Sequence, residues 1–96
     1  MITRIVKLEI APEHSSKFIK IFEQFNQKIG NQPGCVKVDM KRDKHDPNRF
    51  FTISQWNSED DLNNYRNSEL FGQIWPNVKP WFSGKPEAWS LTNIDV

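Results

Sequence analysis

The sequence predicts an α+β fold, with one four-stranded antiparallel sheet covered by helices on one face. Two patterns carry this prediction: three stretches alternate apolar and polar residues and a fourth is an apolar strand-like run, and one long stretch repeats its apolar residues at helical spacing. The third observation is their order, β-α-β-β-α-β, which is characteristic of a split βαβ arrangement. At 96 residues the chain has the length of one domain, which we assign to residues 1–96.

The first half of the chain contains the clearest periodicities. Residues 2–10 alternate and form the first predicted strand. A helix is predicted to open near Pro12, which is tolerated in a first turn, and to end at Gly30. Its apolar residues fall at i, i+4, i+7 and i+11, namely Phe18, Phe22, Phe25 and Ile29. Residues 35–42 alternate again and form the second predicted strand.

The hairpin and the helix start that follow are marked by turn and capping residues. Residues 46–48 are predicted to turn the chain into a third strand over residues 50–56. Ser58 is the predicted N-cap of a short helix, because three acidic residues follow it in the first turn.

The last part of the chain is interrupted by prolines. A second helical piece is predicted around residues 68–75, and Pro76 and Pro80 are expected to break any longer helix there. Residues 88–94 alternate and form the fourth strand. Together these elements predict a ferredoxin-like fold.

The third predicted strand carries large apolar residues on both faces. Phe51 and Ile53 share the face that the helices leave open, and exposing them to water would be costly. A second subunit packed sheet against sheet would cover them. We therefore expect a homodimer.

The opposite face of this strand suggests a cavity beneath the helices. Thr52 and Ser54 stand there between the aromatic residues Phe50 and Trp56, and Arg4 is predicted to lie on a neighbouring strand. Small polar groups leave room under a helix layer, and a buried arginine needs a partner. Alternatively, the two hydroxyls bond to backbone and Arg4 extends past the strand end into solvent.

The composition excludes several classes of partner. The formal net charge is +1, from 13 basic and 12 acidic residues that are interleaved, so we expect no nucleic-acid or membrane surface. Cys35 is the only cysteine and no metal-ligand spacing recurs, so neither a disulfide nor a metal site is expected. No segment approaches about 20 apolar residues, and none resembles a signal peptide. We expect a soluble, cytoplasmic protein.

Several short motifs resemble those of the antibiotic biosynthesis monooxygenase (ABM) domains, which are dimeric α+β barrels. The resemblance covers nearly the whole chain. It rests on Trp56 at a strand end, the helix start 58–62, the stretch 65–68 with Phe71, and the strand entry 33–35. It implies one of three activities: cofactor-free oxidation of aromatic or quinol-like molecules by oxygen, haem degradation, or isomerisation or binding of small molecules.

The haem-degrading branch of that family fits this chain poorly. Trp56 is retained, but Trp75 stands where that branch has its haem-ligating histidine, and Val6 stands where it has an asparagine. The two histidines, His14 and His45, lie elsewhere in the sequence. We therefore expect no haem and no other cofactor. Many quinol-oxidising relatives also carry a histidine where this chain has Tyr65.

The resemblance and the strand pattern together nominate the site residues. Trp56 would shape an aromatic slot and donate a hydrogen bond to a substrate oxygen, or else anchor the core. Tyr65 would stabilise negative charge on the substrate, or else lie half-buried with its hydroxyl in water. Arg4 would neutralise an anionic substrate, or else face solvent or bridge two subunits. The expected substrate-binding set is Arg4, Phe50, Thr52, Ser54 and Trp75, beside Trp56 and Tyr65 as the catalytic pair.

No convincing general base is visible, although cofactor-free oxygenation requires a deprotonated substrate. His14 is the one candidate, and a histidine in the first turn of a helix is ordinarily solvated. The leading hypothesis is a cofactor-independent monooxygenase that acts on a small aromatic or quinol-like molecule. Its rival is a non-catalytic binding or stress-related protein, and a carbonyl isomerase is a third option. If Thr52, Ser54 and Tyr65 face an open volume, the enzyme and binding-protein hypotheses both remain. If Trp56 and Trp75 fill that volume, it argues against catalysis.

Overall fold

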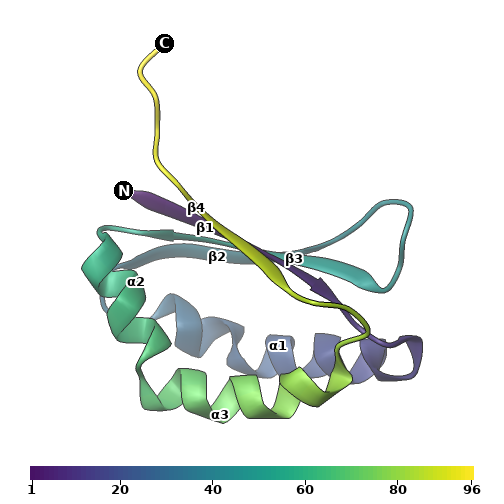
Figure 1. Cartoon of the computed structure of the whole chain (residues 1–96). Helices are drawn as coiled ribbons and strands as arrows, with labels where there is room; N and C mark the ends of the chain where they lie inside the picture. The colour runs from purple at the N-terminus through teal and green to yellow at the C-terminus, as the bar shows by residue number, and fades with distance from the viewer.

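The structure is a computed structural model that describes residues 1–96, and it confirms the predicted α+β, ferredoxin-like fold. One antiparallel sheet has the strand order β2-β3-β1-β4, and all three helices lie on the same face of it (Figure 1). The strands are β1 (Ile2–Glu9), β2 (Cys35–Arg42), β3 (Arg49–Trp56) and β4 (Glu87–Leu91). The helices are α1 (Ser15–Gly30), α2 (Glu59–Arg66) and α3 (Glu69–Val78), with short 3₁₀ turns η1 (Pro12–His14) and η2 (Lys79–Trp81).

The main hydrophobic core lies at one end of the sheet–helix sandwich. It is formed by buried residues of β1 and β3, the segment after β1, and the facing ends of α1 and α3: Leu8, Ile10, Phe18, Phe50 and Val78. Phe18 and Phe50 are in contact at its centre, with ring centroids 4.9 Å apart. Fully burying side chains of this size stabilises the fold by about 1.5–3 kcal/mol each. This core joins the helices to the sheet at one end of the sandwich. The residues at the other end are not part of it.

Two serines start the helices that follow β3. The Ser58 hydroxyl accepts a hydrogen bond from the Asp61 amide at 3.1 Å, as the sequence predicts. The Ser68 hydroxyl accepts one from the Phe71 amide at 3.2 Å, which starts α3 directly after α2. Such caps each contribute about 1 kcal/mol to helix stability.

Pro76 does not break the last helix, contrary to the sequence-based expectation. Helix α3 continues through it to Val78, and only then does the short turn η2 contain Pro80. Proline removes one backbone donor, and its ring crowds the carbonyl four residues earlier. Only Asn77 and Val78 follow Pro76 in the helix, and the Asn77 side chain donates to the Gln73 carbonyl at 2.6 Å. The helix therefore tolerates the proline near its end.

The fourth strand is also shorter than the alternating pattern suggested. It ends at Leu91, and Ile94 is 79% exposed. Figure 1 shows the last residues running away from the body of the molecule. Residues 92–94 alternate in sequence but do not pair with a neighbouring strand.

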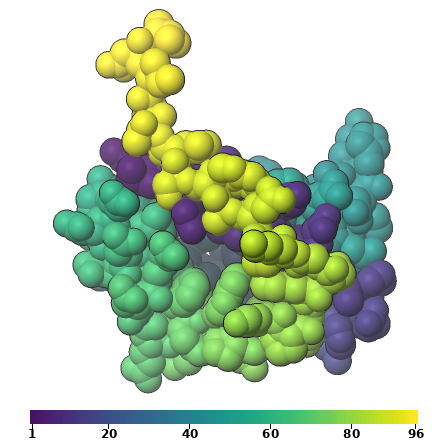
Figure 2. All heavy atoms as spheres, viewed as in Figure 1, coloured from purple at the N-terminus to yellow at the C-terminus, as the bar shows by residue number.

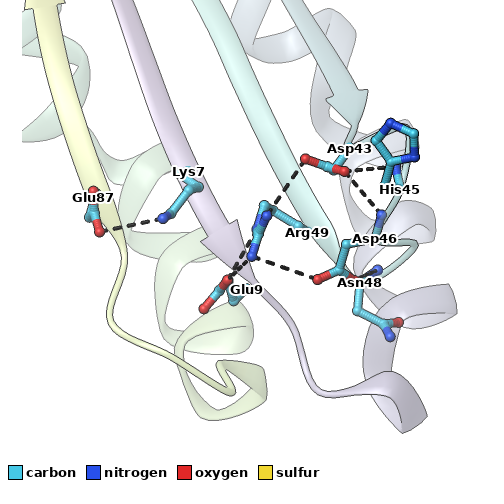
Figure 3. Close-up of polar contacts among 8 residues, drawn as sticks. All are labelled: Lys7, Glu9, Asp43, His45, Asp46, Asn48, Arg49 and Glu87. Carbon is cyan, nitrogen blue, oxygen red and sulfur yellow. Dashed lines mark hydrogen bonds and ion pairs between the residues drawn. The ribbon is translucent and has the colours of Figure 1, made fainter.

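A cluster of ion pairs holds the β2–β3 hairpin to β1. The Arg49 guanidinium lies 3.0 Å from Glu9, 3.7 Å from Asp43 and 3.8 Å from Asp46 (Figure 3). The Asp43 carboxylate also accepts two backbone N–H groups of the turn, from His45 and Asp46. The basic stretch around this turn is thus interleaved with acids that neutralise it locally.

The face of the sheet away from the helices carries a row of apolar side chains among charged ones, such as the ion pair of Lys7 with Glu87 at 3.4 Å. Ile5 is paired with Ile53 on one side and with Trp89 on the other, so three large side chains cross the middle of the sheet in a row. Phe51 and Leu91 extend this row on the same face. Trp89 is 43% exposed and Leu91 is 45% exposed.

None of the helices is long and apolar enough to cross a lipid bilayer.

Candidate functional site

A cavity of about 620 Å³ separates the sheet from helices α2 and α3. Figure 2 shows it as a hollow bounded by α2 and α3 on one side and by β4 on the other. Its volume lies within the range of small-molecule sites, about 300–1,000 Å³. The lining residues of the sheet are Arg4, Val6, Leu8, Val38, Thr52, Ser54, Trp56 and Ala88, joined by Pro86 before β4. The helices contribute Phe18, Phe22, Ile29, Leu62, Asn63, Tyr65, Arg66, Phe71, Ile74, Trp75 and Val78, with Asn67 between α2 and α3.

The floor of the cavity includes small side chains on β3 and on the edge strand β4. Strand pairing places Thr52 opposite Val6 and Ser54 opposite Arg4, and Ala88 lies across from Val6 on β4. In strands, alternate residues share a face, so these positions all point toward the helices. The small volume of Thr52, Ser54 and Ala88 keeps the space beneath α2 and α3 open.

One wall of the cavity is a continuous series of aromatic rings. Trp56 stacks on Tyr65 with centroids 5.1 Å apart and an interplanar angle of 21°. Tyr65 meets Phe71 edge to face at 5.4 Å, and Phe71 stacks on Trp75 at 5.7 Å. Trp75 then meets Phe82 at 5.4 Å, edge to face. Such geometries are favourable for flat rings, and the wall is suited to stacking against an aromatic ligand.

Trp56 is fully buried, and its indole N–H already has an acceptor inside the protein. Nε1 donates to the Ser54 hydroxyl at 2.9 Å. The sequence-based expectation was that this N–H donates to a substrate oxygen, but in the structure the Ser54 hydroxyl already accepts it. Trp56 lines the cavity with its ring stacked on Tyr65, and Ser54 holds the ring in place.

Tyr65 is the polar group of the aromatic wall. Burial, with a smaller contribution from the nearby Cys35 thiol, raises the pKa of Tyr65 to about 12. The phenol is therefore protonated at neutral pH and can donate a hydrogen bond, but it cannot act as a base there. It makes no hydrogen bond to another group of the chain, so its donor is free for a ligand.

Arg4 and Arg66 are the only charged residues that line the cavity. Arg4 comes from the middle of the sheet, where its Nη1 donates to the Ser90 hydroxyl at 3.0 Å. Arg66 is the last residue of α2 and lies exposed at the rim. Burial and then the positive charge of Arg66 lower the pKa of Arg4, which places the two guanidinium groups within electrostatic reach of each other.

The structure brings together six of the seven nominated side chains, and it places one elsewhere. The six that line the cavity are Arg4, Thr52, Ser54, Trp56, Tyr65 and Trp75. Phe50 does not line it: this residue is 1% exposed and belongs to the hydrophobic core against Phe18. It lies on the correct face of β3 but at the end that the core occupies.

Three polar lining residues were not nominated from the sequence: Asn63, Arg66 and Asn67. The helical spacing offered a signal for Arg66, because it follows Leu62 by four residues and Leu62 is buried against the sheet. A residue at that position extends from the same side of α2 toward the cavity.

Histidine, cysteine and carboxylate side chains are absent from the cavity lining. His14 instead stacks on Trp81 with centroids 5.8 Å apart. Burial raises the pKa of the Cys35 thiol, which makes it a poor nucleophile at neutral pH. No group of three or more histidine, cysteine, aspartate or glutamate side chains is placed to hold a metal ion. The cavity thus contains hydrogen-bond donors, aromatic rings and positive charge, and no general base.

Comparisons with known proteins agree with this architecture. The chain superposes on an antibiotic biosynthesis monooxygenase with a TM-score of 0.93 at 20% identity, over 99% of this chain and 100% of that chain. It is also similar to Rv0793 from Mycobacterium tuberculosis, with a TM-score of 0.90 at 14% identity over 99% of this chain and 96% of that one. A conserved protein from Methanosarcina mazei Go1 gives a TM-score of 0.88 at 18% identity, over 95% and 91% of the two chains.

At these identities the structural likeness shows the fold alone. No curated protein sequence matches the chain. The profile of the family described as antibiotic biosynthesis monooxygenase matches residues 1–75, which include all of the helix-covered sheet except β4. The chain belongs to the antibiotic biosynthesis monooxygenase family.

Proposed function

We propose that this protein is a cofactor-independent monooxygenase that oxidises a small aromatic or quinol-like molecule inside the sheet–helix cavity. The observation that carries the proposal is the cavity itself, which is about 620 Å³ in volume, walled by stacked aromatic rings and floored by small polar residues. Membership of a monooxygenase family supports the proposed class of reaction. The aromatic wall supports the proposed class of substrate, because ring stacking favours flat aromatic molecules.

The proposed reaction takes all its electrons from the substrate. An electron-rich ring carbon, activated by loss of a proton, transfers an electron to O₂ and then forms a carbon–oxygen bond. For an anthrone, one oxygen atom becomes the new carbonyl oxygen in place of two hydrogens, and the other oxygen leaves with those hydrogens as water. No external reductant is required, and the protein supplies orientation, exclusion of water and electrostatic stabilisation.

In this proposal Tyr65 donates its phenolic proton to a hydrogen bond with the substrate oxygen that becomes negatively charged. Its raised pKa keeps that proton in place at neutral pH. A preorganised donor of this kind typically contributes about 10²–10³ in rate. Trp56 and Trp75 would hold the ring system flat against the wall.

A non-catalytic binding protein is the second candidate, and one observation favours it. The cavity lining contains no histidine and no carboxylate, so no side chain there can remove a proton from the substrate at neutral pH. A binder needs no such group. A carbonyl isomerase would need one, so the same observation argues against it.

Dimerisation through the open face of the sheet is part of the proposal. The row formed by Ile53, Ile5 and Trp89 presents apolar surface that water would solvate poorly. A second copy packed face to face would bury it. The oligomeric state in solution tests this assembly separately from the activity.

Oxygen uptake by metal-free protein tests the activity. The substrates are a panel of anthrones and quinols, and the variants are Trp56→Phe and Tyr65→Phe, with Trp81→Phe as the matched control because Trp81 does not line the cavity. We expect uptake above the uncatalysed rate that falls about 10²-fold or more in Tyr65→Phe and is unchanged in Trp81→Phe. Uptake that is no faster than without protein would favour the binding protein.

A further inference from the structure

Two arginines share the cavity without a single acid to neutralise them. Arg4 and Arg66 are its only charged lining residues, and no aspartate or glutamate lines it. Neither arginine takes part in any ion pair of the structure. Arg4 makes one side-chain hydrogen bond, to Ser90, which leaves most of its five N–H donors free.

Arg49 differs from this pair because its positive charge is neutralised by nearby carboxylates. Arg49 has the carboxylates of Glu9, Asp43 and Asp46 within 3.8 Å (Figure 3). Arg4 is partly exposed, as Arg49 is, but the charge that shares the cavity with it is a second positive one instead of a carboxylate. Two like charges that line one cavity are best neutralised by an anion that enters it.

We propose that Arg4 and Arg66 form an anion subsite, and that the ligand of the cavity is an aromatic molecule with a negatively charged oxygen group. This inference rests on the proposed aromatic-binding function and names its substrate class more narrowly. The aromatic wall takes the rings of the ligand, and the arginine pair takes the charge. Guanidinium groups suit this role because their planar donors match the oxygens of an anion.

The charged oxygen can have two origins. It is either a permanent carboxylate on the ring system, or a phenol that ionises on binding. An opposite charge within about 4–6 Å lowers the pKa of an acid by about 1–3 units, and two arginines act in the same direction. The second origin would also explain how a cavity without a general base obtains a deprotonated substrate. The only other titratable group in the lining is Tyr65, whose phenol stays protonated at neutral pH.

Three matched probes separate these origins: 2-naphthoate, its neutral isostere 2-naphthamide, and 2-naphthol. Isothermal titration calorimetry with the full chain at neutral pH gives the affinities of the first two. A carboxylate subsite predicts that 2-naphthoate binds at least about tenfold more tightly than 2-naphthamide, since hydrogen bonds to charged groups are the stronger ones. A phenolate subsite predicts that the absorbance titration of bound 2-naphthol is shifted at least about one pH unit below that of free 2-naphthol.

Arg66→Gln is the informative variant, because Arg66 is exposed and its replacement leaves the core intact. Arg66→Gln should abolish the preference for 2-naphthoate over 2-naphthamide, or the shift in the titration of bound 2-naphthol. Arg66→Lys should retain part of either effect. Lys17→Gln removes an equal charge from the exposed side of α1, outside the cavity, and should change neither.

Equal affinity for 2-naphthoate and 2-naphthamide, together with an unshifted 2-naphthol, would overturn the anion subsite while leaving the aromatic cavity in place. Failure of all three probes to bind would overturn both the subsite and the aromatic site. Arginine-dependent binding without oxygen uptake would uphold the subsite and count against the monooxygenase alone.

Discussion

The two faces of the sheet differ in a way that is unusual for a helix-covered sheet. The covered face carries Arg4, Thr52 and Ser54, and a cavity lies above them. The uncovered face carries a row of large apolar residues, Ile53, Ile5 and Trp89, flanked by charged residues such as Lys7 and Glu87. In an ordinary two-layer domain packed side chains fill the covered face and polar residues meet water on the open face, so the cavity and the apolar row are two departures from that pattern.

These two departures indicate that each face meets something the single chain does not provide. The covered face keeps space open, which costs packing energy, and the proposed ligand would occupy that space. The open face keeps apolar surface, which costs solvation energy, and the proposed second subunit would bury it. Stability is supplied by the core around Phe18 and Phe50, of which Leu8, Phe18 and Val78 also line the cavity.

The largest effect is expected on the open face. Phe51→Asp would place a carboxylate in the proposed subunit contact and remove an aromatic ring from it, at a cost of about 3–5 kcal/mol. Light scattering coupled to size-exclusion chromatography should then show a monomer or aggregate in place of a dimer. Phe51→Leu is the matched control and should remain dimeric. A wild-type protein that is a well-folded monomer would contradict the dimer, and the open face would need another explanation.

On the covered face, the hydrogen bond beneath Trp56 should be the next largest contribution. Ser54→Ala removes the acceptor of the Trp56 N–H, which is fully buried, and an unpaired buried donor costs about 1–3 kcal/mol. Denaturant unfolding should show this loss. Ser90→Ala removes the hydroxyl that accepts from Arg4 at an exposed position and should cost less than about 0.5 kcal/mol. Equal losses in both variants would mean that Trp56 finds another acceptor.

The pKa of Tyr65 predicts a smaller effect at alkaline pH. Folding raises this pKa from 10.0 to about 12, so the unfolded chain loses the phenolic proton first. Stability attributable to Tyr65 is therefore complete below pH 10 and decreases as pH rises toward 12. The loss between about pH 9 and about pH 11 should be about 1.4 kcal/mol, and Tyr65→Phe should lack it.

Tyr65 can be observed directly, because it is the only tyrosine in the chain. The near-ultraviolet absorbance of tyrosinate in the native protein should rise with a midpoint near pH 12. A midpoint near the ordinary value of 10 would show that water reaches the phenol freely. The cavity wall would then be more open than the stacking of Trp56 on Tyr65 implies.

The different use of the two faces could be predicted from the sequence because strand alternation is local. Once residues 50–56 are assigned to a strand, Thr52 and Ser54 must share one face and Phe51 and Ile53 the other. The N-cap at Ser58 was equally local and is confirmed. The fold class follows from the order of such elements, and the family was expected from the resemblance of short motifs; both are confirmed.

The position of a residue along a shared face could not be predicted in this way. Phe50 and Trp56 lie on the same face of β3, yet Phe50 belongs to the core and Trp56 to the cavity, because α1 and α3 cover only one end tightly. Alternation carries no information about which part of a face the helices fill. Pro76 was misjudged because a proline weakens a helix locally without always ending it, and α3 continues for two residues beyond it.

The smallest expected change in stability is the most informative about the covered face. Thr52→Leu adds apolar volume to the cavity floor, where a filled core would lose about 1–3 kcal/mol to overpacking. Because the space above Thr52 is open, we expect a stability change within about 1 kcal/mol and at least a tenfold loss of affinity for 2-naphthol. Thr92→Leu in the exposed C-terminal segment is the control and should alter neither quantity. Strong destabilisation with unchanged binding would mean that the helices close over the floor, and that ligands bind elsewhere than between the sheet and α2.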